Sequence, residues 1–178
     1  FTIDCRFSVS TYAAHDFIQF HETENDYTKR LKVFSLASIG GEGAITCDWN
    51  ESTSQVITCK DYMPLYPSDM LYPSDTLYPQ GISINTFKRY TLVFNNGTSY
   101  VYVDGVLCNS GPTSAILANK NWMTIDSTNR LVDYIRIIPN YSATDADIAN
   151  DFEYVYNEEI FFPYNNQPTG FTRCQITK

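Results

Sequence analysis

The first ten residues alternate apolar and polar side chains without a break. Phe1, Ile3, Cys5, Phe7 and Val9 are apolar, and every position between them is polar. Because successive side chains of a strand point to opposite faces, this pattern predicts a half-buried β-strand. Later segments share its β-branched and aromatic character and are bounded by Gly, Asn, Asp and Ser: 32–37, 44–49, 55–60, 90–94, 99–103, 122–125 and 131–138.

Two pairs of these segments form predicted hairpins. Asn96-Gly97 joins 90–94 to 99–103, and both residues tolerate the positive φ of a two-residue hairpin turn. The segments 44–49 and 55–60 flank a polar loop, and a turn near Thr53 would set Cys47 opposite Cys59. Directly opposed strand positions lie close enough for a cross-strand disulfide, so we expect one between Cys47 and Cys59.

A single helix is predicted after Asn140. The Ser142 hydroxyl can cap its first turn, where Asp145 and Asp147 complement the positive end of the helix dipole. Its expected buried stripe follows helical spacing and consists of Ile148, Phe152 and Val155. One short helix near the C-terminus among about ten strands predicts an all-β fold, in one domain covering residues 1–178.

Charge and composition narrow the possible partners. The 178 residues carry a formal charge of −8, with a pI near 4.6. The chain has no basic run, so we expect it to bind neither nucleic acid nor an anionic membrane surface. It contains no apolar stretch long enough to cross a membrane and no signal-peptide pattern at its start. We therefore expect a mature or excised piece of a larger chain or assembly.

Cysteines and sequons suggest an extracellular setting. The five cysteines include no CxxC pair and accompany only two histidines, so zinc ligation is not expected and disulfides are favoured. Three sequons begin at Asn50, Asn96 and Asn140. The first two fall in predicted turns and the third precedes the helix, so all three are expected to be accessible for glycosylation.

The most unusual segment is a Tyr-Pro repeat, inserted as a loop at residues 65–80. Leu-Tyr-Pro recurs with a period of six, and the prolines exclude a central strand. Tyrosine rings can stack on sugar rings while carboxylates accept hydroxyl protons, so this loop is the candidate ligand-binding site. Its residues are Tyr62, Tyr66, Asp69, Tyr72, Asp75 and Tyr78. Two alternatives remain open: a tolerated surface insertion, or tyrosines that fold back and seal the core.

Two longer segments resemble a known superfamily. Residues 89–107, containing Tyr-Val-Asp-Gly, are similar to a strand pair of laminin-G-like and pentraxin-like domains. Residues 130–148, with Asp-Tyr-Ile-Arg-Ile before the helix, look like the same superfamily's C-terminal signature, and Phe1-Thr-Ile resembles its first strand. The resemblance covers roughly residues 1–155 and implies a concanavalin A-like jelly-roll β-sandwich.

The resemblance also implies a disulfide arrangement and a possible metal. Terminal strands of such jelly rolls commonly lie side by side, which implies a Cys5–Cys174 bond and leaves Cys108 unpaired or bonded to another chain. Calcium binds some domains of this fold, but only Asp145 and Asp147 form an acidic pair here, and the helix start explains them. No cofactor is therefore expected, with calcium kept as a minor alternative.

Catalytic patterns are absent from the sequence. The Glu-x-Asp-x-x-Glu pattern of glycoside hydrolases with this fold does not occur, and neither does a Gly-x-Ser-x-Gly elbow. We therefore expect no catalytic residues and a non-catalytic module that binds a glycan outside the cell or at the cell surface. Two alternatives stay open: a protein-binding adhesion or structural module, or the receptor-binding head of a viral attachment protein at the virion surface.

Overall fold

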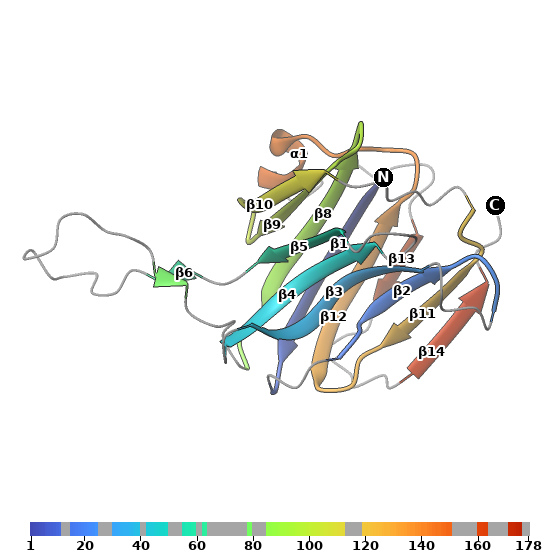
Figure 1. Ribbon diagram of the computed structural model, residues 1–178, viewed down its shortest axis with the longest axis horizontal. Coiled ribbons are helices and arrows are strands. Elements are labelled where there is room, and N and C mark those ends of the chain that lie inside the picture. Colours follow the sequence, from blue (N-terminus) through green and yellow to red (C-terminus); the bar gives the residue numbers. More distant parts are fainter. Residues whose placement is uncertain are drawn as a thin grey trace, which may run out of the picture.

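The computed structural model contains two six-stranded antiparallel sheets packed face to face (Figure 1). It describes residues 1–11, 15–24, 30–39, 42–49, 55–59, 62–63, 78–79, 85–112, 119–150, 160–163 and 171–175. Within these ranges, no helix is long and apolar enough to cross a membrane. The arrangement is a jelly-roll β-sandwich with one short helix, which confirms the predicted fold class.

Each sheet brings together strands that are distant in sequence. Sheet A has the order β10 (Val106–Pro112), β9 (Thr98–Val103), β8 (Lys88–Asn95), β1 (Thr2–Val9), β12 (Arg130–Ile138) and β13 (Ile160–Pro163). Sheet B has the order β14 (Phe171–Gln175), β11 (Trp122–Asp126), β2 (Ile18–His21), β3 (Arg30–Ile39), β4 (Glu42–Trp49) and β5 (Gln55–Cys59). A separate ribbon pairs β6 (Tyr62–Met63) with β7 (Tyr78–Pro79).

The core lies between the sheets and is rich in aromatic rings. The predicted apolar face of β1 lines it completely, from Phe1 to Val9. The Phe7 ring stacks on Tyr90 and meets Phe17 edge to face, with centroids 4.6 and 4.9 Å away. Because large rings interlock here, the core fixes how the two sheets face each other.

The Asn-Gly hairpin is confirmed. Asn96 and Gly97 have φ of 47° and 78°, and Phe94 pairs with Ser99 in the flanking strands. The next connection has the same form, because Asp104 and Gly105 also have positive φ, of 49° and 81°. Both turns match the twist of the strands that they join.

The predicted Cys47–Cys59 pairing is wrong in register. Cys47 lies opposite Ile57, and Cys59 lies opposite Ile45. The two cysteines are therefore diagonal rather than directly opposed. A shift of two residues keeps every side chain on the same face, so the hydrophobic pattern could not distinguish the two registers.

The Cys5–Cys174 bond implied by the resemblance is also absent. Cys5 lies in β1, between β8 and β12 in sheet A, and its thiol is free and buried. Cys174 lies in β14, at the edge of sheet B, opposite Met123. The first and last strands thus belong to different sheets.

The helix begins after a different capping residue from the one predicted. Helix α1 (Asp145–Ala149) is capped by Thr144, whose side chain accepts a hydrogen bond from the Asp147 amide. The Ser142 hydroxyl instead donates to the Phe94 carbonyl, at 2.6 Å. Ile148 is buried as predicted, whereas Phe152 and Val155 lie outside the described residues.

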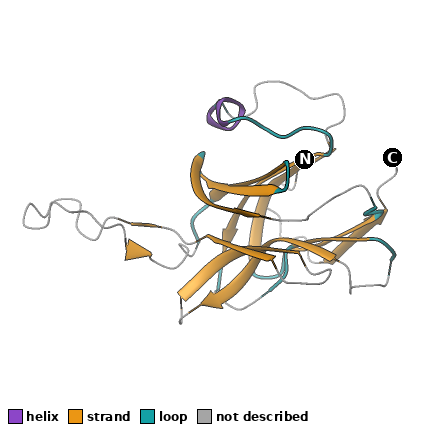
Figure 2. Cartoon of the chain, turned by 45° about the horizontal axis from the view of Figure 1, so that its top comes forward, coloured by secondary structure: helices purple, strands orange, loops and turns teal. Residues whose placement is uncertain are grey.

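Helix α1 covers part of the outer face of sheet A. A second apolar cluster joins α1 and its approach to outward side chains of this sheet: Val93, Tyr102, Ile138, Ala143 and Ile148. Figure 2 shows α1 on the side of sheet A that faces away from sheet B. The polar residues Thr2, Asp4 and Ser8 of β1 are buried, whereas Arg6 on the same face is 49% exposed, so the outer face of β1 is covered only in part.

Candidate functional site

The outer face of sheet B carries polar side chains from adjacent strands. In β3, Leu31 and Val33 point into the core, which places Arg30 and Lys32 on the opposite face. In β2, Ile18 and Phe20 are buried in the core, and the register sets Gln19 beside Lys32 and His21 beside Arg30. Sheet B lies in front in Figure 1, with this face toward the viewer.

Three of these side chains form a polar group with Asp16, which precedes β2. We name this group the Arg30 cluster: Asp16, Gln19, Arg30 and Lys32. The Gln19 amide donates to Asp16 Oδ2 at 3.0 Å, and its oxygen accepts from Arg30 Nη1 at 3.2 Å. Lys32 Nζ lies 3.2 Å from Asp16 Oδ1. Arg30 Nη1 lies 3.9 Å from Asp16 Oδ2, so both cations of the cluster lie near the same carboxylate.

The members of the Arg30 cluster remain partly accessible to solvent. The side chains of Asp16, Arg30 and Lys32 are 26%, 23% and 19% exposed. Their positions are held by strand pairing and by one another, so little side-chain entropy remains to be lost on binding. A guanidinium, an amide, an ammonium and a carboxylate together can donate to and accept from sugar hydroxyls.

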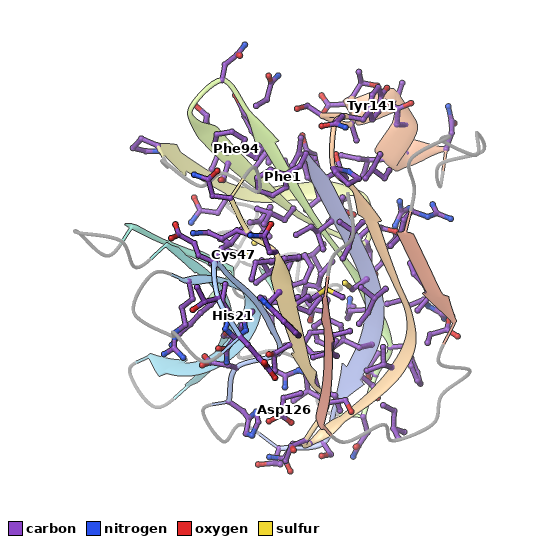
Figure 3. All side chains as sticks on the ribbon, turned by 90° about the vertical axis from the view of Figure 1, so that its right-hand side faces the viewer. Phe1, His21, Cys47, Phe94, Asp126 and Tyr141 are labelled. Carbon is purple, nitrogen blue, oxygen red and sulfur yellow. The ribbon has the colours of Figure 1, made fainter. Side chains whose placement is uncertain are left out.

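A buried pair supports the face beside this cluster. His21 Nε2 lies 2.9 Å from the Thr124 hydroxyl of β11, and His21 is fully buried. Trp122 lies beside His21 in the β2–β11 pairing and is half-buried. In Figure 3, His21 lies on the sheet B side of the molecule, between the end marked by Phe1 and the end marked by Asp126.

Lys120 forms one rim of the face. Its side chain is completely buried, and its ammonium lies 3.4 Å from Glu22 Oε1, whose side chain is 35% exposed. The adjacent Asn121 amide donates to the His21 carbonyl at 3.0 Å, which joins the rim to β2. A buried ammonium needs such a partner, so Glu22 is held at this edge.

A bulge in β3 determines which side chains reach the outer face. The β3–β4 register shifts between Lys32 and Ser35, and Phe34 has φ of 55°, in the left-handed region. Arg130 Nη2 donates to the Phe34 carbonyl at 3.3 Å and to the His15 carbonyl at 3.1 Å. A bulge changes the alternation of a strand, so this contact helps to set the direction of Arg30 and Lys32.

A second polar group, on the outer face of sheet A, has a structural role. Asp4 is fully buried and accepts hydrogen bonds from Arg89 Nε at 2.9 Å, from the Tyr134 hydroxyl at 2.9 Å and from Thr91. Arg89 Nη1 also donates to the Ile148 carbonyl of α1, at 3.0 Å. This group connects α1 to the sheet and offers no exposed ligand surface at Asp4.

Most of the predicted ligand-binding residues cannot be placed. Tyr62 and Tyr78 belong to the β6–β7 ribbon, where Tyr62 pairs with Pro79 and Tyr78 with Met63. Tyr66, Asp69, Tyr72 and Asp75 lie outside the described residues. The structure therefore leaves the predicted loop site untested.

The predicted glycosylation sites are partly placed. Asn96 and Asn140 are exposed, as their predicted accessibility requires, whereas Asn50 lies outside the described residues. Among the side chains that are described, no group of three or more His, Cys, Asp or Glu could hold a metal ion.

The sequence pattern did contain a signal for the Arg30 cluster. Ile18-Gln-Phe-His and Arg30-Leu-Lys-Val both alternate, and their polar residues are in register, but the strand predicted in this region covered only 32–37. Their pairing depends on the intervening segment, which gives no turn signal as strong as Asn-Gly. Asp16 joins the cluster from outside either strand, which no strand periodicity could predict.

Comparisons with known proteins bear on the fold. No protein-family model matches the sequence, and no curated protein matches it. A solved structure of the Ruminococcus gnavus IT-sialidase CBM40 bound to alpha2,3 sialyllactose is similar, with a TM-score of 0.55 and 9% identity, over 85% of this chain and 81% of that one.

Two further solved structures are less similar. Another structure of the R. gnavus module has a TM-score of 0.42 and 10% identity, over 64% of this chain and 53% of that one. A native heptameric SAP-like pentraxin from Limulus polyphemus has a TM-score of 0.44 and 12% identity, over 97% and 81%. At such identities the likeness concerns the fold alone.

Proposed function

We propose that the protein is a non-catalytic glycan-binding module whose sugar ligand binds the outer face of sheet B. The observation that carries the proposal is the Arg30 cluster, a hydrogen-bonded set of donors and one acceptor on a rigid sheet. In the described part of the chain no helix covers this face, whereas α1 covers part of the outer face of sheet A. The fold likeness to a carbohydrate-binding module supports the same proposal.

The charge of the cluster favours an acidic glycan. Arg30 presents a planar guanidinium fork, which suits a carboxylate, and Lys32 adds a second cation 3.2 Å from the only carboxylate in the cluster. The carboxylate of a sialic acid would accept hydrogen bonds from these two cations, while Gln19 and Asp16 would bind hydroxyls. The similar carbohydrate-binding module is itself bound to a sialylated sugar, which makes this sugar the first ligand to test.

Titration calorimetry with α2,3-sialyllactose and with lactose tests the proposal. We expect wild-type protein to bind sialyllactose more tightly than lactose, and Arg30→Ala and Lys32→Ala each to weaken binding roughly tenfold, because each removes a charge-assisted contact. Arg6→Ala is the matched control. Arg6 is also a strand cation paired with an Asp, but it lies on sheet A, 49% exposed, and its loss should leave affinity unchanged.

Two results would contradict the proposal. Wild-type protein that binds neither sugar, and no other sugar on a glycan array, would exclude glycan binding as the function. Tight binding that survives both Arg30→Ala and Lys32→Ala would place the site elsewhere, with the Tyr-Pro loop as the first alternative.

A protein-binding or structural role is the second candidate. Val106 and Leu107 on edge strand β10 are 69% and 50% exposed, which is unusual for large apolar side chains. A blank glycan array would favour this role. Both glycan binding and protein binding agree with the exposed Asn96 sequon. Both also agree with a protein located outside the cell or at a cell or virion surface.

A further inference from the structure

Trp122 presents an aromatic side chain on the same face of sheet B as the Arg30 cluster. In β11, Met123 and Ile125 belong to the core, so the alternation of the strand places Trp122 on the outer face. Trp122 is half-buried, so part of the residue remains accessible to solvent. An indole in this position offers an apolar surface on which a ring can stack, together with one N–H donor.

Strand pairing aligns Trp122 with Arg30 across three adjacent strands, β11, β2 and β3 (Figure 1). Trp122 lies directly opposite His21, and His21 lies directly opposite Arg30. Neighbouring strands are about 4.8 Å apart, so the backbone positions of Trp122 and Arg30 are about 10 Å apart. This span is comparable to the length of a disaccharide. A glycan whose carboxylate binds Arg30 would therefore have its next ring within reach of the indole.

His21 and Thr124 form a buried base between these two residues. His21 Nε2 lies 2.9 Å from the Thr124 hydroxyl oxygen, and both residues are buried. This contact joins β2 to β11 through side chains in addition to the backbone pairing. Since a buried histidine cannot touch a ligand, the accessible groups of the row Trp122–His21–Arg30 are at its two ends.

The neighbouring row indicates the direction of the ligand. It consists of Lys32, Gln19 and Thr124, which are directly opposed in the same three strands. Lys32 and Gln19 are partly accessible and belong to the Arg30 cluster, whereas Thr124 is buried. The accessible charged and amide groups of both rows therefore lie on β2 and β3, and the aromatic side chain lies on β11. This arrangement matches a ligand with an acidic end followed by a ring that has an apolar face.

We propose that Trp122 binds the sugar ring next to the acidic sugar, so that the glycan runs across the strands from β3 toward β11. The proposal rests on the glycan-binding function proposed above. The acidic sugar lies at Arg30 and Lys32, and the apolar C–H face of the next sugar packs on the indole. The site then recognises at least a disaccharide, and a single acidic sugar uses only the Arg30 end.

Titration calorimetry with two sialosides tests the proposal. Methyl α-sialoside contains the acidic sugar alone, whereas α2,3-sialyllactose adds the ring that we assign to Trp122. We expect wild-type protein to bind sialyllactose roughly tenfold more tightly than methyl sialoside. In Trp122→Ala this preference should disappear, because the affinity for sialyllactose falls to that for methyl sialoside, which itself stays unchanged.

Two variants provide matched comparisons. Arg30→Ala should weaken the binding of both sugars by a similar factor, because both carry the carboxylate that Arg30 binds. Tyr100→Ala removes another half-buried aromatic side chain, which packs against the apolar cluster between sheet A and α1. It should leave both affinities unchanged, because Tyr100 lies on the other sheet.

NMR of the wild-type protein adds a measurement that no substitution can disturb. The chain has two tryptophans, so only the indole N–H signals of Trp49 and Trp122 need to be distinguished in a 15N-labelled sample. We expect sialyllactose to shift the Trp122 signal and methyl sialoside to leave it near its position in the free protein.

Failure of this proposal is distinguishable from failure of the proposed function. Equal affinities of wild-type protein for the two sugars would overturn the role of Trp122 and leave the Arg30 site intact. A Trp122 signal that sialyllactose does not shift, or an equal loss of affinity for both sugars in Trp122→Ala, would also overturn it. Wild-type protein that binds neither sugar would overturn this proposal, and a blank glycan array would overturn the glycan-binding function with it.

Discussion

Arg130 shows how one buried charge can organise several segments. Its guanidinium lies over the Phe17 ring, 4.7 Å from the centroid, and donates to the carbonyls of His15, Phe34 and Thr128. Burial removes its hydration and lowers the pKa of Arg130 to about 10, so it stays charged at neutral pH. Three backbone carbonyls, one of them at the β3 bulge, thus depend on one side chain.

Replacement of Arg130 should therefore destabilise the folded protein. Arg130→Ala leaves three carbonyls without this donor and opens space beside two aromatic rings, so we expect a loss of about 3 kcal/mol or more in the free energy of unfolding. Denaturant unfolding measures it. Arg6→Ala, which removes a half-exposed arginine, should change stability by no more than about 0.5 kcal/mol. Equal effects of the two variants would show that Arg130 does not hold the bulge.

Gly97 adopts the positive φ that its hairpin turn requires, and a substitution can test this requirement. Its φ of 78° is strained for a β-branched residue, so Gly97→Val should destabilise the protein by more than about 1 kcal/mol. Gly111→Val is the control, because Gly111 lies in β10 without a positive φ. Urea midpoints of the two variants check the difference, and an unchanged midpoint for Gly97→Val would contradict it.

At the scale of elements, α1 is too short to be stable by itself and depends on its contacts with sheet A. The Tyr102 hydroxyl donates to Asp145 Oδ1 at 2.7 Å, and the Tyr141 hydroxyl donates to Asp147 Oδ2 at 2.7 Å. Arg89 binds the last turn through the Ile148 carbonyl. The helix is therefore docked at both ends by polar contacts around a small apolar cluster.

The Tyr102–Asp145 contact predicts a pH effect. Burial, with the neighbouring carboxylate, raises the pKa of Tyr102 from 10 to about 12, so the folded state keeps this proton where the unfolded state loses it. The stabilisation is complete below pH 10 and is lost as the pH rises toward 12. Tyr102→Phe should show a smaller loss of stability than wild type across this interval. Urea midpoints at pH 9, 10 and 11 measure it, and an equal loss of stability in both proteins would contradict it.

At the scale of the whole molecule, the two sheets have different exposed faces. In sheet A, α1 covers part of the outer face around a buried Asp4 network; in sheet B, the Arg30 cluster is partly accessible beside the buried His21 and Thr124. We propose that ligand binding uses the partly accessible part of sheet B.

The Tyr-Pro repeat needs its own experiment at this scale. If Tyr66, Tyr72 and Tyr78 form a binding surface, each Tyr→Ala variant should lose roughly 1–3 kcal/mol of glycan affinity with an unchanged melting temperature. If they seal the core, each should lose roughly 3–5 kcal/mol of stability instead. Calorimetry and thermal unfolding of the three variants distinguish these outcomes. A large fall in Tm with unchanged affinity in all three would reject the binding-loop hypothesis.

The sequence by itself identified most of the strands, one hairpin turn and the all-β class of fold, but it did not identify β2, β6, β7, β10, β13 or β14. The alternation from Phe1 to Val9 identified one set of core residues, because the period of a strand is local and needs no knowledge of partners. Asn96-Gly97 identified its turn for the same reason, since positive φ is a property of the two residues themselves.

Only the tertiary structure decided which strands are neighbours and which polar side chains are buried. Cys5 and Cys174 are in different sheets, and Cys59 lies opposite Ile45, because strand order and register depend on contacts distant in sequence. The burial of Asp4 and the assembly of Asp16, Gln19, Arg30 and Lys32 have the same origin. A local pattern shows which face of a strand is polar, whereas only packing of the whole chain determines what covers that face.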